Sequence, residues 1–204
     1  MSSPDTVQAD RPYGREEVME SVLDAARELF AASGPDNVSM RSIANKARVN
    51  HALIHRHFGT KDELIKAVLH REAVGFSESL ANVATSSEAA GALFAENLRR
   101  REFVRILAYS LLSDLDMEPW YSDAGAMAPL IDRARRDLDA TPEDTAPIIA
   151  AAALSAFTKG WVLFEPWVLR AVGRATGSQL DPVDVRRHVS VLLEGLFNPT
   201  PDDR

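Results

Sequence analysis

The chain has 204 residues, of which 46% are hydrophobic and 26% charged, a composition typical of a globular protein of one or two domains. It has no cysteine, which excludes disulfides, zinc–thiolate sites, iron–sulfur clusters and thiol nucleophiles and fits a reducing compartment. The net charge of −7 argues at first against a nucleic-acid partner, although a whole-chain charge describes no single face.

Targeting signals are not evident in the sequence. No basic, apolar segment of the signal-peptide type opens the chain. The longest weakly polar stretch, residues 146–157, is shorter than the roughly 20 residues of a membrane span. We therefore expect a cytoplasmic protein with no membrane partner.

The N-terminal third begins with a tail and a helix. Residues 1–14 are mostly polar and show no apolar period, which predicts a disordered tail. Apolar residues then recur at helical spacing and predict a helix that ends at Ser33-Gly34-Pro35. They are Val18, Val22, Ala26, Leu29 and Phe30.

Three short units with clear helix boundaries follow. Ser39 is an N-cap for a short helix that ends before the turn at residues 48–50, where Asn50 caps a second helix over residues 51–57. Val49 and Ile54 have the spacing of a hydrophobic staple. Residues 60–63, Thr-Lys-Asp-Glu, form a capping box that predicts the start of a longer helix.

Beyond residue 72 the pattern remains helical. Helical segments are expected around residues 88–113, 124–138, 141–172 and 181–197, with Pro142 and Pro182 at helix starts and Pro166 kinking or breaking its helix. We find no strand period, glycine-rich phosphate loop or internal repeat. The predicted fold class is all-α.

Two short helices joined by a three-residue turn are the signature of a helix-turn-helix. With Ile54 facing inward, steps of 100° place Ala52 and Arg56 on the opposite side of the second helix, with Leu53 and His55 on its flanks. His51 lies at its exposed N-terminal end. Arg and His donors, a small Ala and an apolar Leu suit the base edges of a DNA major groove.

The local charge supports this interpretation. Residues 39–71 carry seven Lys and Arg against two acids, a net charge of +5. Lys61 lies in the first turn of its helix, where a cation opposes the helix dipole unless an anion such as phosphate is near. The alternative is that Lys61 is simply solvated.

SMRSIA at residues 39–44 and VNHALIHRHFGTKDEL at residues 49–64 resemble the DNA-binding domain of the TetR family of transcriptional regulators. The resemblance covers residues 15–70 and implies an all-α homodimer. A three-helix helix-turn-helix domain at residues 15–70 would precede a helical-bundle domain for ligand binding and dimerisation at residues 71–204. It further implies a repressor that binds a palindromic double-stranded DNA operator and is released by a small-molecule effector.

Carried over by position, the resemblance places phosphate contacts on five residues and base contacts on three. The phosphate contacts are Ser39, Arg41, His55, His57 and Lys61, and the base contacts are His51, Leu53 and Arg56. Ala52 completes the expected DNA-binding set. The chain departs from the family at Arg48 and Ala52, where glycine is usual or frequent, and at His55, where tyrosine is usual. Arg48 implies a strained or differently closed turn.

The resemblance also implies that the last two long helices pair with those of a second copy. Ala152, Ala156 and Gly160 recur at four-residue spacing, which permits close helix approach, and the last helix has a broad apolar face. The expected dimerisation residues are Ala152, Ala156, Phe157, Gly160, Trp161, Val189, Leu192 and Leu196, with Phe197 a further candidate. The alternative for each is a place in the intramolecular core.

Aromatic and methionine side chains suit a pocket for a flat or apolar molecule. The ligand-binding candidates are Phe103, Leu107, Tyr109, Leu112, Met117, Trp120, Tyr121, Met127, Phe164 and Trp167. These residues could instead be ordinary core.

Two other classes of function are weighed. A helical enzyme is disfavoured because no catalytic constellation or cofactor loop is evident, so we expect no catalytic residue, metal or cofactor. His51 and His55 have the spacing of a metal pair but lack the intervening Glu of a metalloprotease. A DNA-binding accessory protein without ligand control is the other alternative.

Overall fold

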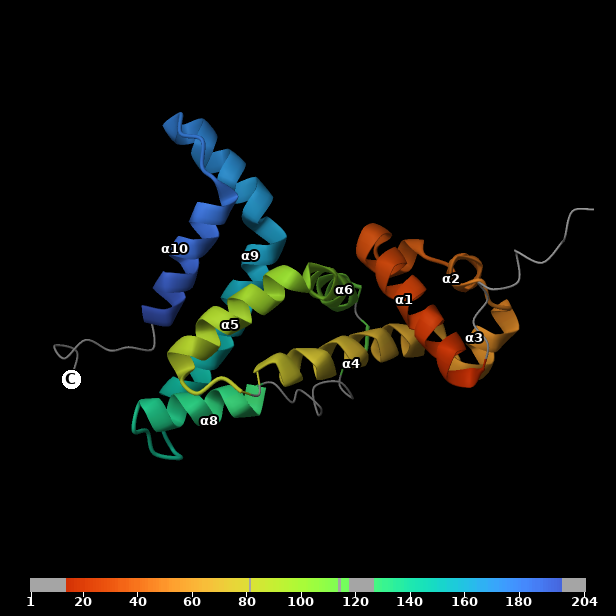
Figure 1. Ribbon diagram of the computed structural model, residues 1–204, viewed down its shortest axis with the longest axis horizontal. Coiled ribbons are helices and arrows are strands. Elements are labelled where there is room, and N and C mark those ends of the chain that lie inside the picture. The colour runs from red at the N-terminus through yellow and green to blue at the C-terminus, as the bar shows by residue number, and fades with distance from the viewer. Residues whose placement is uncertain (1–13, 81, 114, 118–126, 196–204) are drawn as a thin grey trace, which may run out of the picture. The chain divides into compact units, whose positions relative to one another are not determined.

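The computed structural model describes residues 14–80, 82–113, 115–117 and 127–195, and every regular element within them is a helix (Figure 1). The expected all-α class is therefore confirmed. The elements are α1 (Arg15–Ser33), the 3-10 helix η1 (Pro35–Asn37), α2 (Met40–Ala47), α3 (His51–Phe58), α4 (Lys61–Leu80), α5 (Ser86–Arg99), α6 (Arg101–Leu112), α8 (Met127–Asp137), α9 (Ala146–Thr176) and α10 (Pro182–Gly195).

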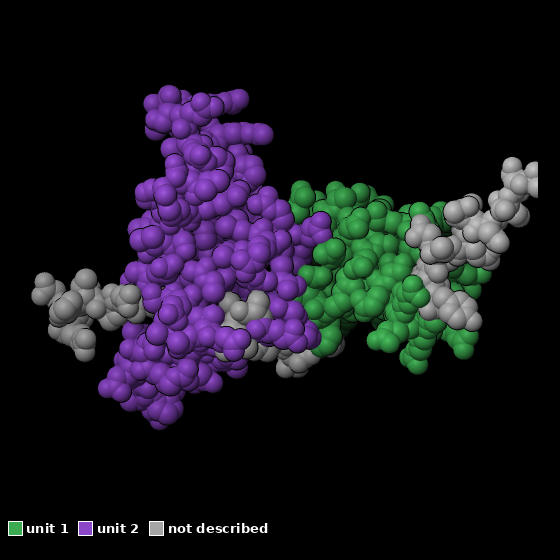
Figure 2. Space-filling model, viewed as in Figure 1, with its two compact units in different colours: residues 1–72, 105–121 green, residues 73–104, 122–204 purple. Residues whose placement is uncertain are grey.

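The helices form two compact units, coloured separately in Figure 2. The first comprises the chain up to Glu72 together with residues 105–121, and the second comprises residues 73–104 and 122–204. Both α4 and α6 contribute residues to each unit. This grouping differs from the continuous division at residue 70 expected from the sequence, because the second half of α6 packs with the N-terminal helices.

The helix boundaries expected in the N-terminal unit are confirmed by their hydrogen bonds. Ser39 Oγ accepts the backbone N–H of Ser42 at 3.0 Å, and Asn50 Oδ1 accepts that of Ala52 at 2.9 Å. Thr60 and Glu63 form the expected capping box: the Thr60 N–H donates to Glu63 Oε2 at 2.7 Å, and the Glu63 N–H donates to Thr60 Oγ1 at 3.2 Å. These bonds satisfy backbone donors that a helix start leaves unpaired.

Each of α1, α2, α3 and α4 has at least one apolar residue that is completely buried in the N-terminal unit. Its core includes Val22, Phe30, Ile43, Ile54 and Leu64, none of which exposes any surface. A side-chain bond ties α1 to the end of α2, where Ser21 Oγ donates to the Ala47 carbonyl at 3.0 Å. The short helices α2 and α3 thus depend on burial against longer neighbours, since helices of eight residues are unstable alone.

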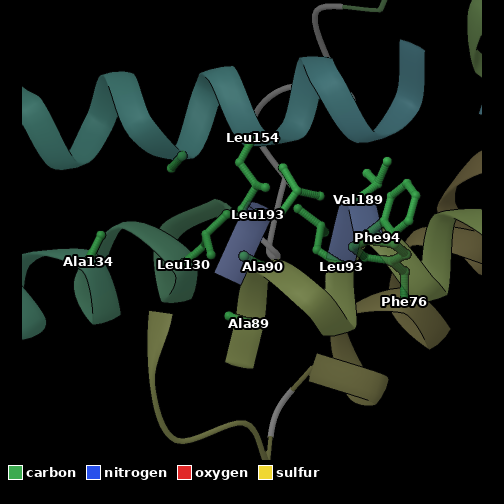
Figure 3. Close-up of a cluster of buried hydrophobic side chains, with 11 residues drawn as sticks. Phe76, Ala89, Ala90, Leu93, Phe94, Leu130, Ala134, Leu154, Val189 and Leu193 are labelled. Carbon is green, nitrogen blue, oxygen red and sulfur yellow. The ribbon is translucent and has the colours of Figure 1, made fainter. Parts of the chain in front are cut away.

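The core of the second unit gathers side chains from five helices (Figure 3). Leu93 and Phe94 of α5, Leu154 of α9 and Leu193 of α10 point toward one another, beside Leu130 of α8. The other members are Phe76, Ala89, Ala90, Ala134, Ala151 and Val189. Alanines at these positions allow the helix backbones to approach closely, so the bundle is held by apolar burial.

Several helix boundaries in the C-terminal part differ from those expected around residues 88–113 and 141–172. The segment expected at 88–113 is two helices, because the chain turns at Arg100 (φ −98°, ψ 39°). The first of these begins earlier, at Ser86, through a capping box of Thr85 and Glu88. The helix expected from residue 141 begins at Ala146, where the Asp144 side chain accepts the N–H of Ala146 at 2.9 Å. Residues 141–144 form a turn instead.

Helix α9 is more apolar than the sequence suggested, over a length close to that expected. It runs for 31 residues with Pro166 inside it, so the proline does not break the helix. An 18-residue window has a mean hydropathy of 1.5, and 28% of that window is buried. By length and composition α9 could cross a membrane, which corrects the expectation of a stretch that is too short. Core helices of soluble proteins can have the same length and composition, but most of this window of α9 is not buried, so the helix has much uncovered apolar surface.

A buried ion pair joins α9 to α10. Arg186 donates to both carboxylate oxygens of Glu165 at 2.6 Å, and Trp161 Nε1 donates to Glu165 Oε1 at 3.1 Å. The carboxylate is 3% exposed. The hydrogen bonds from Arg186 hold the pKa of Glu165 below its ordinary value of 4.5, against the opposing effect of burial, because they favour the ionised form.

Glu165→Gln is expected to lower the free energy of unfolding at pH 7 by about 1.5–3 kcal/mol, the usual contribution of hydrogen bonds to a charged group. Because the folded-state pKa is depressed, the stabilisation is present above the unfolded pKa and is lost as pH falls through the folded value. The difference between variant and wild type should therefore shrink below about pH 4.5. Urea unfolding from pH 3 to 7 measures this difference in the free energy of unfolding, and Glu143→Gln, at an exposed residue, is the control. A difference independent of pH would contradict the assignment.

Candidate nucleic-acid interface

Helix α3 presents one buried and one exposed face, as its sequence predicts. Ile54 is completely buried, whereas His51, Ala52, His55 and Arg56 are exposed. Leu53 and His57 are half-buried on the flanks. Of the expected base-contacting side chains, His51 and Arg56 thus lie on the uncovered side of α3 and Leu53 lies on its flank, while the opposite side of the helix is buried. The two flanking phosphate candidates on α2, Ser39 and Arg41, are also exposed.

The turn between α2 and α3 closes through backbone bonds. The Val49 N–H donates to the Ala44 carbonyl at 3.0 Å, and the Arg48 N–H donates to that of Asn45 at 3.3 Å. This is the Schellman arrangement, which requires a left-handed residue at its C′ position. Arg48 fills that position with φ 56° and ψ 33°. The strained turn expected from an arginine in place of glycine is present, because a Cβ is disfavoured in this region.

Arg48→Gly is expected to raise the free energy of unfolding by about 1 kcal/mol, since glycine adopts the left-handed conformation without steric cost. Arg48→Ala keeps the Cβ and removes the rest of the side chain, so it should give no such gain. Denaturant midpoints of the two variants and the wild type measure the difference. Equal changes in both variants would show that the arginine side chain, and not the backbone, sets the stability of this turn.

The turn after α3 requires glycine for two reasons. Gly59 has φ 73°, and a Cβ there would lie 2.2 Å from Glu63 Oε2, the capping-box oxygen of α4. The same close approach lets α4 begin directly behind α3. Hydrogen bonds from the backbone and side chain of Thr60 lower the pKa of Glu63, so the cap remains ionised at neutral pH.

Lys61 makes a contact that the sequence did not indicate. Its Nζ donates to the backbone carbonyl of Pro35 in η1 at 3.0 Å, and the side chain is half-buried. The Lys61 ammonium is therefore not simply solvated, because one of its hydrogen bonds is made within the protein. It has three donors, and the bond to Pro35 fixes its position at the N-terminus of α4, where a phosphate would also meet free N–H groups.

Ion pairs reduce the charge of the segment from residue 39 to 71. Lys46 pairs with Glu28 at 2.7 Å, and Arg71 with Glu20 and Asp24 at 2.9 and 3.0 Å. Lys66 lies 3.6 Å from Asp116. In the described part of the chain, Arg41, Arg56 and Lys61 have no acidic partner, so the positive charge that remains available is concentrated on the exposed helix-turn-helix surface.

The C-terminal end of α6 and the residue after it contact the connection between α1 and α2 in the first unit. Ser113 Oγ donates to Asp36 Oδ2 at 2.8 Å, and a Cβ added at Gly34 would stand 3.3 Å from two ring carbons of Tyr109. Both contacts fall on the short connection between α1 and α2, next to the carbonyl that binds Lys61. Sequence reasoning missed this cluster, because the contacting residues lie more than 70 positions apart.

The expected ligand-binding residues do not share one environment. Phe103, Leu107 and Met117 are buried, Met127 is half-buried, and Tyr109 is 39% exposed. Leu112, Phe164 and Trp167 expose still more of their surface. Trp120 and Tyr121 lie outside the described residues. The assignment of these residues to a pocket stays a prediction.

The expected dimerisation residues flank an apolar groove. This groove, between α9 and α10, has a volume of about 640 Å³. Its lining is Ala150, Ala153, Leu154, Phe157, Trp161, Val189, Leu192 and Leu193, four of which are in the expected set. Ala152 and Ala156 are exposed, and Gly160 has no neighbour where a Cβ would be. Trp161 and Val189 also pack on the core of their own chain. Leu196 and Phe197 lie outside the described residues.

Comparisons with known proteins agree with this geometry. Residues 22–68 match the sequence model of "Bacterial regulatory proteins, tetR family". The chain is 36% identical over 193 residues to the HTH-type transcriptional repressor Rv3405c of Mycobacterium tuberculosis, and equally to the HTH-type transcriptional regulator Mb3439c of Mycobacterium bovis. Each alignment covers 94% of this chain and 97% of the relative.

Solved structures show the same fold at lower identity. The transcriptional regulator SCO4942 of Streptomyces coelicolor is 20% identical with a TM-score of 0.68, over 88% of this chain and 97% of that one. A TetR-like transcriptional regulator of Rhodococcus sp. RHA1 is 21% identical with a TM-score of 0.62, over 91% and 96%.

The relatives bear on function as well as on fold. Because they and the matched family are transcriptional regulators, the expectation that the chain is not an enzyme is confirmed. The expected resemblance is likewise confirmed, by alignment over almost the full length of the mycobacterial regulators. The chain belongs to the TetR family of bacterial transcriptional regulators and carries their N-terminal helix-turn-helix.

Proposed function

We propose that the protein is a homodimeric repressor that works in the cytoplasm, binds a palindromic operator through α3 and leaves it when a small apolar or aromatic molecule binds. The exposed face of α3 is the observation that carries this proposal. Ile54 fixes the buried side of this helix. Its exposed side presents Arg56 and two imidazoles, which are hydrogen-bonding groups suited to DNA. The repressor named among the relatives supports repression over activation.

The proposed DNA contacts divide by chemistry. His51, Leu53 and Arg56 read base edges, since Arg donates bidentately to guanine and Leu can touch a thymine methyl. Phosphate contacts fall on Ser39, Arg41, His55, His57 and Lys61, which surround the base-reading residues on α2, α3 and α4. Phosphate contacts orient the protein on DNA without carrying sequence information.

The groove between α9 and α10 is proposed to receive the same helices of a second copy. Its rim includes Phe157, 45% exposed, and Leu192, 69% exposed. The exposed apolar surface continues along α9 with Ile149, Phe164 and Trp167. Contiguous apolar surface of this kind marks an interaction site in a monomer. Two-fold pairing would place two α3 helices in successive major grooves, about 34–36 Å apart.

Effector control requires that the ligand distinguish two arrangements of the helix-turn-helix. The contacts of Tyr109 with Gly34 and of Ser113 with Asp36 support such coupling, because α6 also carries residues of the second unit. Helix α4, which starts at Lys61 directly behind α3, offers a second connection. A movement of either helix would change the position of α3.

Selection of bound sequences from random duplex DNA tests the proposal. The expected result is an inverted repeat whose half-sites are centred one helical turn, about 10 base pairs, or a multiple of it apart, occupied by an even number of protomers. Repeating the binding with candidate compounds should reveal one that releases the DNA. Enrichment of no sequence would overturn operator reading, and an operator affinity that no compound changes would favour an accessory protein without ligand control.

A further inference from the structure

His51 and His55 are in direct contact on the exposed side of α3. Their Nε2 atoms lie 3.2 Å apart, and the ring centroids lie 4.6 Å apart with the planes at 80°. Two imidazole nitrogens bound to one metal ion at about 2.0–2.1 Å lie about 2.8–3.4 Å apart for bond angles between 90° and the tetrahedral value. The observed separation is that of a two-histidine chelate.

The backbone fixes one of the two rings in the form that binds metal. His55 Nδ1 lies 3.0 Å from the carbonyl oxygen of Gly59, which can only accept, so Nδ1 carries the proton. The neutral His55 ring therefore has its lone pair on Nε2, facing His51. A backbone carbonyl on the second ring nitrogen is the usual support of a metal-bound histidine.

We propose that His51 and His55 bind one divalent transition-metal ion, of the class of Zn²⁺, Ni²⁺ or Cu²⁺, on the DNA-reading face of α3. The Nε2–H of His51, which donates to His55 in the metal-free pair, is replaced by the ion as the proton moves to Nδ1 through solvent. The proton stays on the His51 ring, so the exchange is a change of tautomer that needs no other proton acceptor.

The residues around His51 and His55 determine which metal ions the pair can bind. No acidic residue lies within α3, and the described residues contain no cluster of three or more potential ligands. Mg²⁺ and Ca²⁺ need several oxygen ligands and are excluded, whereas imidazole suits zinc, nickel and copper. Water completes the coordination, and the positive end of the helix weakens binding. The site is thus suited to reversible occupancy.

Metal occupancy competes with DNA, a consequence that rests on the proposed function. The ion covers His51, which the proposal assigns to base edges, and immobilises His55 beside it. Loss of one good base contact corresponds to about a tenfold decrease in operator affinity. The metal-bound protein should therefore dissociate from its operator more readily, while non-specific phosphate binding should change little.

Binding of the metal alone is measured first, on protein without a polyhistidine tag. Equilibrium dialysis against Ni²⁺ and electron paramagnetic resonance with Cu²⁺ should show one ion per protomer and two nitrogen ligands. His51→Ala and His55→Ala should each weaken binding at least about tenfold, because the chelate is lost. His188→Ala is the matched control: His188 is exposed and its Nδ1 bonds a carbonyl four residues away, at Asp184, but it has no imidazole partner.

Operator affinity with and without Ni²⁺ is measured second, with Mg²⁺ as the control ion. A tenfold weakening by Ni²⁺ in wild type and His188→Ala, absent from His51→Ala, would support the proposal. Equal Ni²⁺ binding by wild type and His51→Ala would overturn the site, and Ni²⁺ binding without loss of affinity would overturn the competition. DNA binding by metal-free protein tests the proposed function separately, so the two failures are distinguishable.

Discussion

Leu192→Glu is expected to make the protein monomeric and to lower its operator affinity at least about 100-fold. Leu192 lies at the rim of the groove between α9 and α10 and is 69% exposed in the single chain. In the proposed dimer this position is covered, and an unpaired carboxylate would have to be buried. A monomer binds each half-site independently and loses the effective concentration that links two sites, a factor of about 10²–10⁴.

Val183→Glu is the matched control for this experiment. Val183 lies on the same helix and is also 69% exposed, but it stands nine residues away, half a turn around α10, and does not line the groove. It should leave both association and operator affinity unchanged. Sedimentation equilibrium and DNA titration measure the two variants. Dimers that persist in Leu192→Glu, or monomers in both variants, would contradict the assignment of the groove.

Ile54→Ala is expected to lower the free energy of unfolding by about 2–5 kcal/mol, the usual cost of removing a large aliphatic side chain from a core. Ile54 is completely buried and holds the exposed face of α3 in place. The variant should also lose sequence-specific DNA binding, because α3 has no other fully buried side chain. Denaturant unfolding and DNA titration of the same sample measure both effects.

Leu53→Ala separates the two roles of α3. Leu53 is the preceding residue, is half-buried, and lies on the flank proposed to face DNA. Its truncation should cost far less stability than that of Ile54 but should still change the preferred operator sequence. Similar stability losses in the two variants would mean that the buried face of α3 is not the one described.

The helix-turn-helix could be predicted from the sequence because its signals are local. The caps at Ser39 and Asn50 and the capping box at Thr60 each act on backbone groups within three residues. The position of Ile54 then fixes which side of α3 is covered. Even the unusual backbone of Arg48 was foreseeable, because the three-residue turn requires a left-handed residue there.

Contacts between distant residues could not be predicted in the same way. The bond from Lys61 to Pro35 and that from Ser113 to Asp36 join positions 26 and 77 residues apart. Ion pairing of Lys46 with Glu28 also lies outside any local pattern, so counting charges overestimates the charge left available for DNA. These contacts depend on how helices pack, which residue spacing alone does not determine.

The C-terminal helices gave weaker signals for a physical reason. The apolar residues of alanine- and leucine-rich helices suit both a core and an interface, so composition could not separate the two. The chain turns at Arg100 without a proline or glycine to mark the place. Conversely, Pro166 predicted a kink or a break, but α9 continues as a helix on both sides of it.

Selection of operator sequences with wild type and Arg56→Ala, compared with Lys61→Ala, tests the central claim that α3 reads DNA. Arg56→Ala should weaken binding by about 1–3 kcal/mol and relax the preference at one position in each half-site, because Arg56 is assigned to a base edge. Lys61→Ala should weaken binding to all sequences similarly and reduce the salt dependence. If Arg56→Ala instead selects the same sequences as wild type, α3 does not read bases through this residue.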